Sequence, residues 1–317
     1  LPFLQACNEI GLLNDLEQKK ADGKPWKHAI QIDIKSHGYF VVDMLVLPVN
    51  GPSGAIERFW SISYDITEQV RKVNEIKAKE KEVKESLVYA KRIQQTILPD
   101  KGAIDDTIVK KMEAEWFVMY KPKDIVSGDF YWYSFVGPRT AFLAVVDCTG
   151  HGVPGAFMSL IGYNLLNQIV NVKKIIKPGE IVAELHSEVR TTLKQDAEDS
   201  KSRDGMDVCL VALDLFDDTF EYAGANRPLF FFHNGELQEI KPDKASIGGE
   251  QMEEDRVFKT HSLEFSSGDS IYMVSDGYVD QFGGPDQKKF STKRFRELIT
   301  ANQHDKMSVQ KAMFNLA

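Results

Sequence analysis

The sequence predicts a mixed α+β protein built from three successive regions. Short strand patterns separated by turns fill residues 1–65, a heptad pattern runs through residues 66–98, and strand patterns with two helices occupy residues 99–317. At ~150 residues per domain, a chain of 317 residues suggests about two domains. We therefore expect a small antiparallel sheet, a long connecting helix and a larger unit of strands and helices.

Composition excludes several classes of protein. Hydrophobic residues make up 43% and charged residues 27% of the chain, which is typical of globular proteins. The formal charge is 39 − 47 = −8, which argues against nucleic acid as a partner because phosphate binding needs a basic surface. No apolar run reaches the ~18 residues of a membrane span and no leader peptide is visible, although a first residue that is not Met suggests a cut end.

The three cysteines, Cys7, Cys148 and Cys209, indicate the compartment. Their odd number and wide spacing fit neither a disulfide framework nor a zinc site. Cys209 lies in an apolar strand pattern, so we expect it to be buried. The cysteines therefore favour the reducing cytoplasm.

The N-terminal region predicts an antiparallel meander. Residues 28–35 alternate polar and apolar side chains, as a half-buried strand does. A longer β-rich run covers residues 39–49, a Gly- and Pro-containing turn covers residues 50–54, and residues 58–64 return as a strand.

Residues 66–98 predict a coiled-coil helix. Asp65 is suited to cap it, and Glu68 three residues later completes a capping-box pattern. Seven of the ten core heptad positions are apolar, so the helix is expected to pair with a second copy and form a homodimer. Glu80 and Gln94 occupy core positions, where they weaken the seam and either set the register or allow a second one. The excess of basic residues is interpreted as a solvated face.

The region 99–317 predicts one compact unit with seven strands and two helices. Its helices begin at Pro154 and Pro178, because proline favours the first helical position. Asn234-Gly235 predicts a hairpin, and the polar residues 195–205 predict a mobile loop. The expected strands are 115–120, 130–136, 140–146, 208–215, 219–222, 229–233 and 270–274.

Two of these strands share a design that points to chemistry. The apolar strands 140–146 and 270–274 each deliver a carboxylate to their end, Asp147 and Asp276, followed by small or Gly-rich backbone. A third acid, Asp129, precedes an aromatic strand. Converging carboxylates need raised pKa values or bound cations. Because these motifs contain no Lys or Arg, and because oxygen ligands favour Mg²⁺ or Mn²⁺, we predict a metal site. Any one of these acids alone would be interpreted as a turn or cap residue.

Four motifs follow one another in a fixed order along the chain. They are Val126-Ser-Gly-Asp-Phe-Tyr-Trp132, Asp147-Cys-Thr-Gly-His-Gly-Val-Pro-Gly155, Tyr222-Ala-Gly-Ala-Asn-Arg-Pro-Leu229 and Ser275-Asp-Gly277. These motifs resemble those of SpoIIE-type serine phosphatases, which belong to the metal-dependent PPM superfamily with the type 2C enzymes. The resemblance covers roughly residues 86–300 and implies a β-sandwich flanked by helices (αββα) with a two-ion Mn²⁺ or Mg²⁺ centre. Residues 1–70 resemble the C-terminal part of a PAS sensor domain.

The resemblance also implies roles for individual residues. Asp147 would bridge the two ions, the backbone carbonyl of Cys148 would bind one of them, and Asp276 would bind the other. Asp129 would hold an ion directly or through water. Asp147 and Asp129 are therefore the expected catalytic residues, and the ions would activate a water for attack on a phosphoserine.

The sequence departs from the family pattern at three places. Thr149 stands where the type 2C enzymes have a proposed general acid, so His151, two residues on, is a weaker candidate for that role. Asp207 stands where the family has a hydroxyl residue, and it could be an extra ligand, a water-holding group or a solvent-facing charge. The family's last metal-binding Asp comes from an Asp-Asp pair in a final strand, which residues 300–317 do not offer.

Asn226-Arg227-Pro228 allows two interpretations. The preferred one is a loop between strands, and the other is that Asn226 or Arg227 faces a phosphoprotein, because Arg matches phosphate geometry.

The first functional hypothesis is a cytoplasmic phosphatase for a phosphorylated regulatory protein, such as an anti-sigma-factor antagonist, switched by the PAS-like region through the coiled coil. The rival is a non-catalytic interaction module with the same fold. A nucleotide enzyme is weaker, because the chain has neither a P-loop nor a GxGxxG motif.

Overall fold

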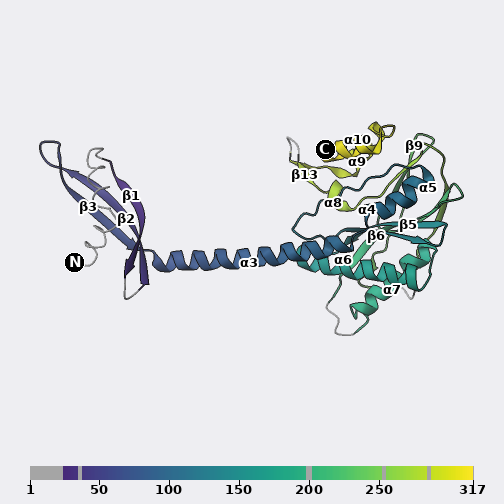
Figure 1. Cartoon of the computed structure of the whole chain (residues 1–317), viewed down its shortest axis with the longest axis horizontal. Helices are drawn as coiled ribbons and strands as arrows, with labels where there is room; N and C mark the ends of the chain where they lie inside the picture. Colours follow the sequence, from purple (N-terminus) through teal and green to yellow (C-terminus); the bar gives the residue numbers. More distant parts are fainter. Residues whose placement is uncertain (1–23, 35–37, 198–201, 252–254, 284–286, 317) are drawn as a thin grey trace. The chain divides into compact units, whose positions relative to one another are not determined.

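The computed structural model describes residues 24–34, 38–197, 202–251, 255–283 and 287–316. The chain forms two compact units, Leu1–Ser86 and Leu87–Ala317, each described here by itself. Figure 1 labels the helices and strands. No helix within the described ranges is long and apolar enough to cross a membrane. Cys7 lies outside these ranges, and Cys209 is buried as predicted.

The first unit contains the predicted antiparallel meander. Its sheet has the order β1-β2-β3, and both pairings are antiparallel. Met44 and Val46 of the central strand are buried. The strands are β1 (Trp26–Ile34), β2 (Gly38–Asn50) and β3 (Ile56–Asp65).

A single long helix, α3 (Thr67–Ile97), follows this sheet and contains the boundary between the units. Asp65 caps it, because its Oδ1 accepts a hydrogen bond of 2.9 Å from the backbone N–H of Thr67. The capping box itself does not form, since Glu68 pairs with Lys72 instead. The helix is present as predicted, whereas its pairing with a second copy stays a prediction.

The second unit has two antiparallel sheets. The larger has the order β11-β7-β6-β5-β4, with β10 paired to β6, and the smaller has the order β12-β8-β9. Asn234 and Gly235 form the predicted hairpin turn between β8 and β9, with φ values of 52° and 81°. The large sheet consists of β4 (Phe130–Val136), β5 (Thr140–Cys148), β6 (Gly205–Asp214), β7 (Thr219–Ala225), β10 (Ile247–Gly248) and β11 (His261–Glu264). The small sheet consists of β8 (Leu229–His233), β9 (Glu236–Ile240) and β12 (Ser270–Tyr272), and β13 (Phe282–Gly283) pairs with β14 (Lys288–Lys289).

Helices cover both outer faces of these sheets, as Figure 1 shows. On the large sheet lie α6 (Gly152–Asn167), its π-helical extension η2 (Gln168–Val172) and α7 (Pro178–Thr192). Against the small sheet pack α9 (Ser291–Ala301) and α10 (Met307–Leu316). The shorter helices are α4 (Lys101–Ile104), η1 (Asp105–Val109), α5 (Lys110–Met112) and α8 (Asp276–Val279).

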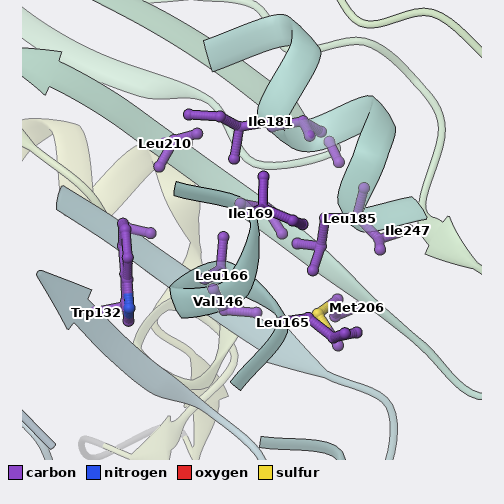
Figure 2. Packing of buried hydrophobic residues seen from close by; sticks show 14 of the residues in the cluster. Trp132, Val146, Leu165, Leu166, Ile169, Ile181, Leu185, Met206, Leu210 and Ile247 are labelled. Atoms are coloured by element: carbon purple, nitrogen blue, oxygen red, sulfur yellow. The ribbon is translucent and has the colours of Figure 1, made fainter. Parts of the chain in front are cut away.

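Alternation along the strands produces the predicted αββα layers. On β5, Phe142 and Ala144 pack toward α6 and α7, whereas Ala141 faces the layer between the sheets. On β8, Leu229 and Phe231 contribute to that inner layer, and Phe230 packs against α9 and α10. Figure 2 shows the outer cluster, in which side chains of α6, η2 and α7 meet those of the large sheet.

The second unit contains short strands that the sequence analysis does not predict, namely β10, β11, β13 and β14, and three further details also differ. Residues 115–120 form no strand, although their side chains alternate: Trp116 joins the inner cluster, whereas Phe117 and Met119 join the cluster between the small sheet and the helices α9 and α10. The alternation of side chains in the sequence therefore reflects packing on two sides, and not pairing with a neighbouring strand. α6 begins at Gly152, two residues before Pro154, whereas α7 begins at Pro178 as predicted. Of the predicted loop 195–205, residues 198–201 lie outside the described ranges, and Gly205 already belongs to β6.

Candidate functional site

The register of the large sheet brings three carboxylates together at the ends of three adjacent strands. Phe130 of β4 pairs with Val146 of β5, which places Asp129 next to Asp147. Asp147 in turn pairs directly with Asp207 of β6. Three neighbouring strands therefore present Asp129, Asp147 and Asp207 side by side.

The small sheet contributes a fourth carboxylate. After β12 the chain turns into α8, whose first residue is Asp276. The backbone N–H of Asp276 donates to Oδ2 of Asp147 at 3.1 Å, and the hydroxyl of Ser275 donates to Oδ2 of Asp129 at 2.5 Å. Both sheets are therefore joined at this acidic cluster, which we define as Asp129, Asp147, Asp207 and Asp276.

The expectation that no Lys or Arg neutralises these acids is wrong, because the guanidinium of Arg227 reaches them. Its Nη2 lies 3.0 Å from Asp147, 3.2 Å from Asp207 and 2.9 Å from Asp276. The preferred interpretation of residues 226–228 as a loop between strands is confirmed, since they connect β7 to β8, but it ranked the side chains of this loop too low. The segment is a loop by backbone, but its side chains reach the site because β7 lies next to β6 and Asn226 forms a bridge with Val208.

Asp207 is held by several donors. Its Oδ1 accepts hydrogen bonds from Asn226 Nδ2 at 2.9 Å and from the hydroxyl of Ser246 at 3.0 Å, while Oδ2 faces Arg227. It belongs to the cluster and does not project freely into solvent, since only 21% of its side chain is exposed. Whether it binds a metal stays a prediction.

The electrostatics of the cluster follow from burial and mutual repulsion. Burial, with the charge of Asp129, raises the pKa of Asp147 to about 7. Burial also raises the pKa of Asp129, with Asp276 adding to the shift. Burial opposes the charge of Arg227, but Asp147, Asp276 and Asp207 outweigh it and raise its pKa. The cluster contains four carboxylates and one guanidinium, which contacts three of them, so a further positive charge would stabilise it.

The Gly-rich segment after β5 shapes the floor of the site. Gly150 and Gly152 have φ values of +86° and +65°, which favour glycine. A Cβ on Gly128 would lie 2.6 Å from the carbonyl oxygen of Gly150 and 3.3 Å from that of Cys148. The carbonyl of Cys148 therefore lies beside the Asp129 loop, while the Cys148 thiol is buried and burial raises its pKa.

Thr149 and His151 take different positions at the site. The Thr149 hydroxyl accepts a hydrogen bond of 3.0 Å from the N–H of Gly205, which ties the Gly-rich segment to β6. His151 precedes α6 and pairs with Asp124 through its Nδ1 at 2.7 Å, with 72% of its side chain exposed. His151 therefore lies at the rim, and its catalytic role stays a prediction.

These residues line one cleft of about 500 Å³. The structure brings all six of the predicted site residues to it: Asp129, Asp147, Cys148, His151, Asp207 and Asp276. Sequence reasoning ranked Arg227 too low and did not consider Ser275. The available signal was that Arg227 is the one Lys or Arg within the four family-like motifs.

The donor set fits a divalent cation chemically. Carboxylate and carbonyl oxygens are the ligands that Mg²⁺ and Mn²⁺ prefer, and three of these carboxylates already surround a positively charged nitrogen. As their side chains stand, however, no three Asp, Glu, His or Cys groups among the described residues are arranged around a common point that could hold a metal ion. The cluster holds a cation, and that cation is Arg227.

A two-sheet sandwich between helices, with carboxylates from both sheets in one cleft, defines the class of PP2C-type phosphatase domains. The solved SiaA-PP2C domain of Pseudomonas aeruginosa is 29% identical in sequence and superimposes with a TM-score of 0.66, covering 75% of this chain and 90% of that one. The family described as Stage II sporulation protein E (SpoIIE) matches residues 137–315, more than half of the chain. The chain belongs to the SpoIIE family.

A curated relative agrees with this assignment. Phosphoserine phosphatase RsbP of Bacillus subtilis (strain 168) is 21% identical over 199 residues, which cover 62% of this chain and 46% of RsbP. The chain therefore spans about half the length of this relative.

Proposed function

We propose that this chain is a divalent-metal-dependent phosphatase for phosphoserine or phosphothreonine on a regulatory protein. The observation that carries the proposal is the convergence of four carboxylates from two sheets in one cleft of a SpoIIE-family chain. RsbP, a phosphoserine phosphatase, supports the substrate class. An anti-sigma-factor antagonist is the kind of substrate that we expect, and the cytoplasm is the expected compartment.

The proposed metal ligands are Asp147, Asp129, Asp276 and the carbonyl of Cys148, with Asp207 as a further candidate. Mn²⁺ or Mg²⁺, in two sites, would lower the pKa of a bound water and neutralise phosphoryl charge. Ser275 holds the Asp129 carboxylate through its hydroxyl, and the N–H of Asp276 holds Asp147. His151, oriented by Asp124 at the rim, is the candidate that would give a proton to the leaving seryl oxygen.

The test is hydrolysis of p-nitrophenyl phosphate and of a phosphoserine peptide by the full chain with Mn²⁺. We expect Asp147→Asn to lower kcat/KM by at least about 100-fold, since even outer-shell partners of a metal contribute 10–100-fold. The matched control is Asp106→Asn, an exposed carboxylate that pairs with Lys110. Unchanged activity in Asp147→Asn would refute the proposed mechanism.

A second candidate is a non-catalytic interaction module that keeps the fold and binds the regulatory protein. The observation that favours it is Arg227, which already compensates part of the acidic charge. Calorimetric titration with Mn²⁺ separates the two candidates. A folded chain that binds the regulatory protein but no Mn²⁺ would support the module.

We also propose that α3 regulates the site. Gln94, in the last turns of α3, is only 4% exposed. Its Nε2 donates to the carbonyl of Ser127 at 2.6 Å and to the Ser159 hydroxyl at 2.8 Å, and its Oε1 accepts from the N–H of Ser127 at 3.0 Å. Ser127 is two residues before Asp129, so a shift of α3 would move the Asp129 loop. The signal that reaches α3 would come from the PAS-like sheet.

A further inference from the structure

The loop that carries Arg227 has a tightly fixed backbone. The hydroxyl of Tyr222 donates to the carbonyl of Arg227 at 2.7 Å, and the N–H of Arg227 donates to the carbonyl of Ala225 at 2.7 Å. A Cβ on Gly224 would lie 2.0 Å from the Tyr222 hydroxyl, so only glycine fits beneath this contact. The fixed backbone directs the Arg227 side chain toward the acidic cluster.

The contacts of the Arg227 guanidinium are those of a point cation. One nitrogen, Nη2, lies within 3.2 Å of carboxylates from Asp147, Asp207 and Asp276. Stable Arg–carboxylate pairs are instead commonly bidentate, with two parallel N–H donors. The Nε of Arg227 is buried and has no hydrogen-bond partner within the part of the chain that the structure describes. A purely structural ion pair would be expected to use this donor.

The guanidinium of Arg227 therefore partly neutralises the acidic cluster with a hydrogen-bond geometry that does not suit it. The Arg227 side chain is 16% exposed, and Arg227 lines the cleft of about 500 Å³, which gives the guanidinium room to leave the carboxylates. A divalent cation brings twice the charge to the same oxygens without needing a hydrogen-bond geometry.

We infer that Arg227 and a divalent cation compete for the carboxylates of Asp147 and Asp276. In the metal-free chain Arg227 is their counter-ion and holds the two sheets together at the cluster. Binding of Mn²⁺ or Mg²⁺ displaces the guanidinium into the cleft. The inference rests on the proposed function only in taking these carboxylates as metal ligands.

The test is calorimetric titration of Mn²⁺ into the full chain and its variants, without substrate. We expect Arg227→Gln to bind Mn²⁺ at least about tenfold more tightly than the wild type, a change in the range that residues around metal ligands produce. The metal-free Arg227→Gln variant should also melt at a lower temperature, because its carboxylates lose their counter-ion. The matched control is Arg139→Gln, which removes a guanidinium paired with Asp214 and Asp217 at the surface.

A second measurement uses the wild type alone. Phenylglyoxal modification of Arg227, followed by peptide mass spectrometry, should increase when Mn²⁺ is added, because displacement exposes the guanidinium. Modification of Arg139 should not change.

The outcomes separate the competition from the proposed function. Mn²⁺ affinity that is unchanged or weaker in Arg227→Gln, or phenylglyoxal reactivity that Mn²⁺ leaves unchanged, would overturn the competition while the metal-dependent phosphatase stands. Absence of Mn²⁺ binding in both the wild type and Arg227→Gln would overturn both. Binding by Arg227→Gln alone would support the competition in its strongest form.

Discussion

Gly155, in the first turns of α6, is a residue at which packing and helix propensity predict opposite effects. Alanine favours a helix over glycine by about 1 kcal/mol. A Cβ at this position would however lie 2.6 Å from the carbonyl oxygen of Gly150 and 2.9 Å from the Cα of Gly128, both of them backbone atoms. Because backbone cannot move aside as a side chain can, the steric effect should dominate.

We expect Gly155→Ala to lower the free energy of unfolding by about 1–3 kcal/mol, as overpacking does. It should also lower phosphatase activity, because Gly128 precedes Asp129. Urea denaturation and kcat/KM measure the two effects. Gly102→Ala in α4 is the control, since its Cβ meets only the carboxylate of Asp100. A stabilised Gly155→Ala variant would show that propensity dominates and that the contact is soft.

At this scale the acids of the site were predictable and their base was not. Asp147 lies at the end of the apolar strand β5 and Asp276 follows β12, so the apolar runs of the sequence show that both carboxylates are delivered to strand ends. Arg227 follows β7, and its distance from Asp147 depends on β7 lying beside β6. Strand order is a tertiary property that local pattern does not contain. The metal-binding roles of the acids stay predictions.

Helix α3 changes its environment along its length. Val73, Ile76 and Val83 are 48–58% exposed in the isolated chain, as unpaired seam residues would be. Gln94 continues the same heptad frame but is buried against Ser127 and Ser159. The heptad pattern therefore predicted the helix correctly. The predicted role of Gln94 as a residue of the coiled-coil seam is wrong, because a heptad pattern does not show which surface covers a given position.

The regulatory role of α3 leads to a test at Gln94. Gln94→Ala leaves the N–H and the carbonyl of Ser127 without their partner, and each unpaired buried group costs about 1–3 kcal/mol. We expect a Mn²⁺ affinity at least about tenfold weaker, because the Asp129 loop is no longer held. Calorimetric titration measures it, and Gln95→Ala on the exposed side of the same turn is the control. Equal Mn²⁺ affinity in Gln94→Ala and Gln95→Ala would contradict the coupling.

Across the whole molecule, the period-2 patterns predicted most strands of the second unit, whereas the layers were implied by the family resemblance. The alternation on β5 and β8 separates the inner cluster from the outer ones, which is the αββα arrangement that the family resemblance implied. Residues 115–120 carry the same alternation without a ladder partner. An alternating sequence pattern therefore shows that a segment is buried on two sides. Whether the segment pairs with a neighbouring strand depends on the tertiary fold.

The last prediction concerns the assembly of the chain. If the exposed apolar residues of α3 form a seam with a second copy, charges placed in that seam should separate the copies, because a buried unpaired Lys is strongly disfavoured. We expect the Ile76→Lys, Val83→Lys double variant to sediment as a monomer where the wild type sediments as a dimer. The control places the same charges off the seam, in Asn74→Lys with Ala78→Lys. The prediction fails if the wild type is itself monomeric or if both double variants stay dimeric. Hydrolysis that persists unchanged in the monomer would further show that the cleft works without the assembly and that pairing serves the regulation proposed for α3.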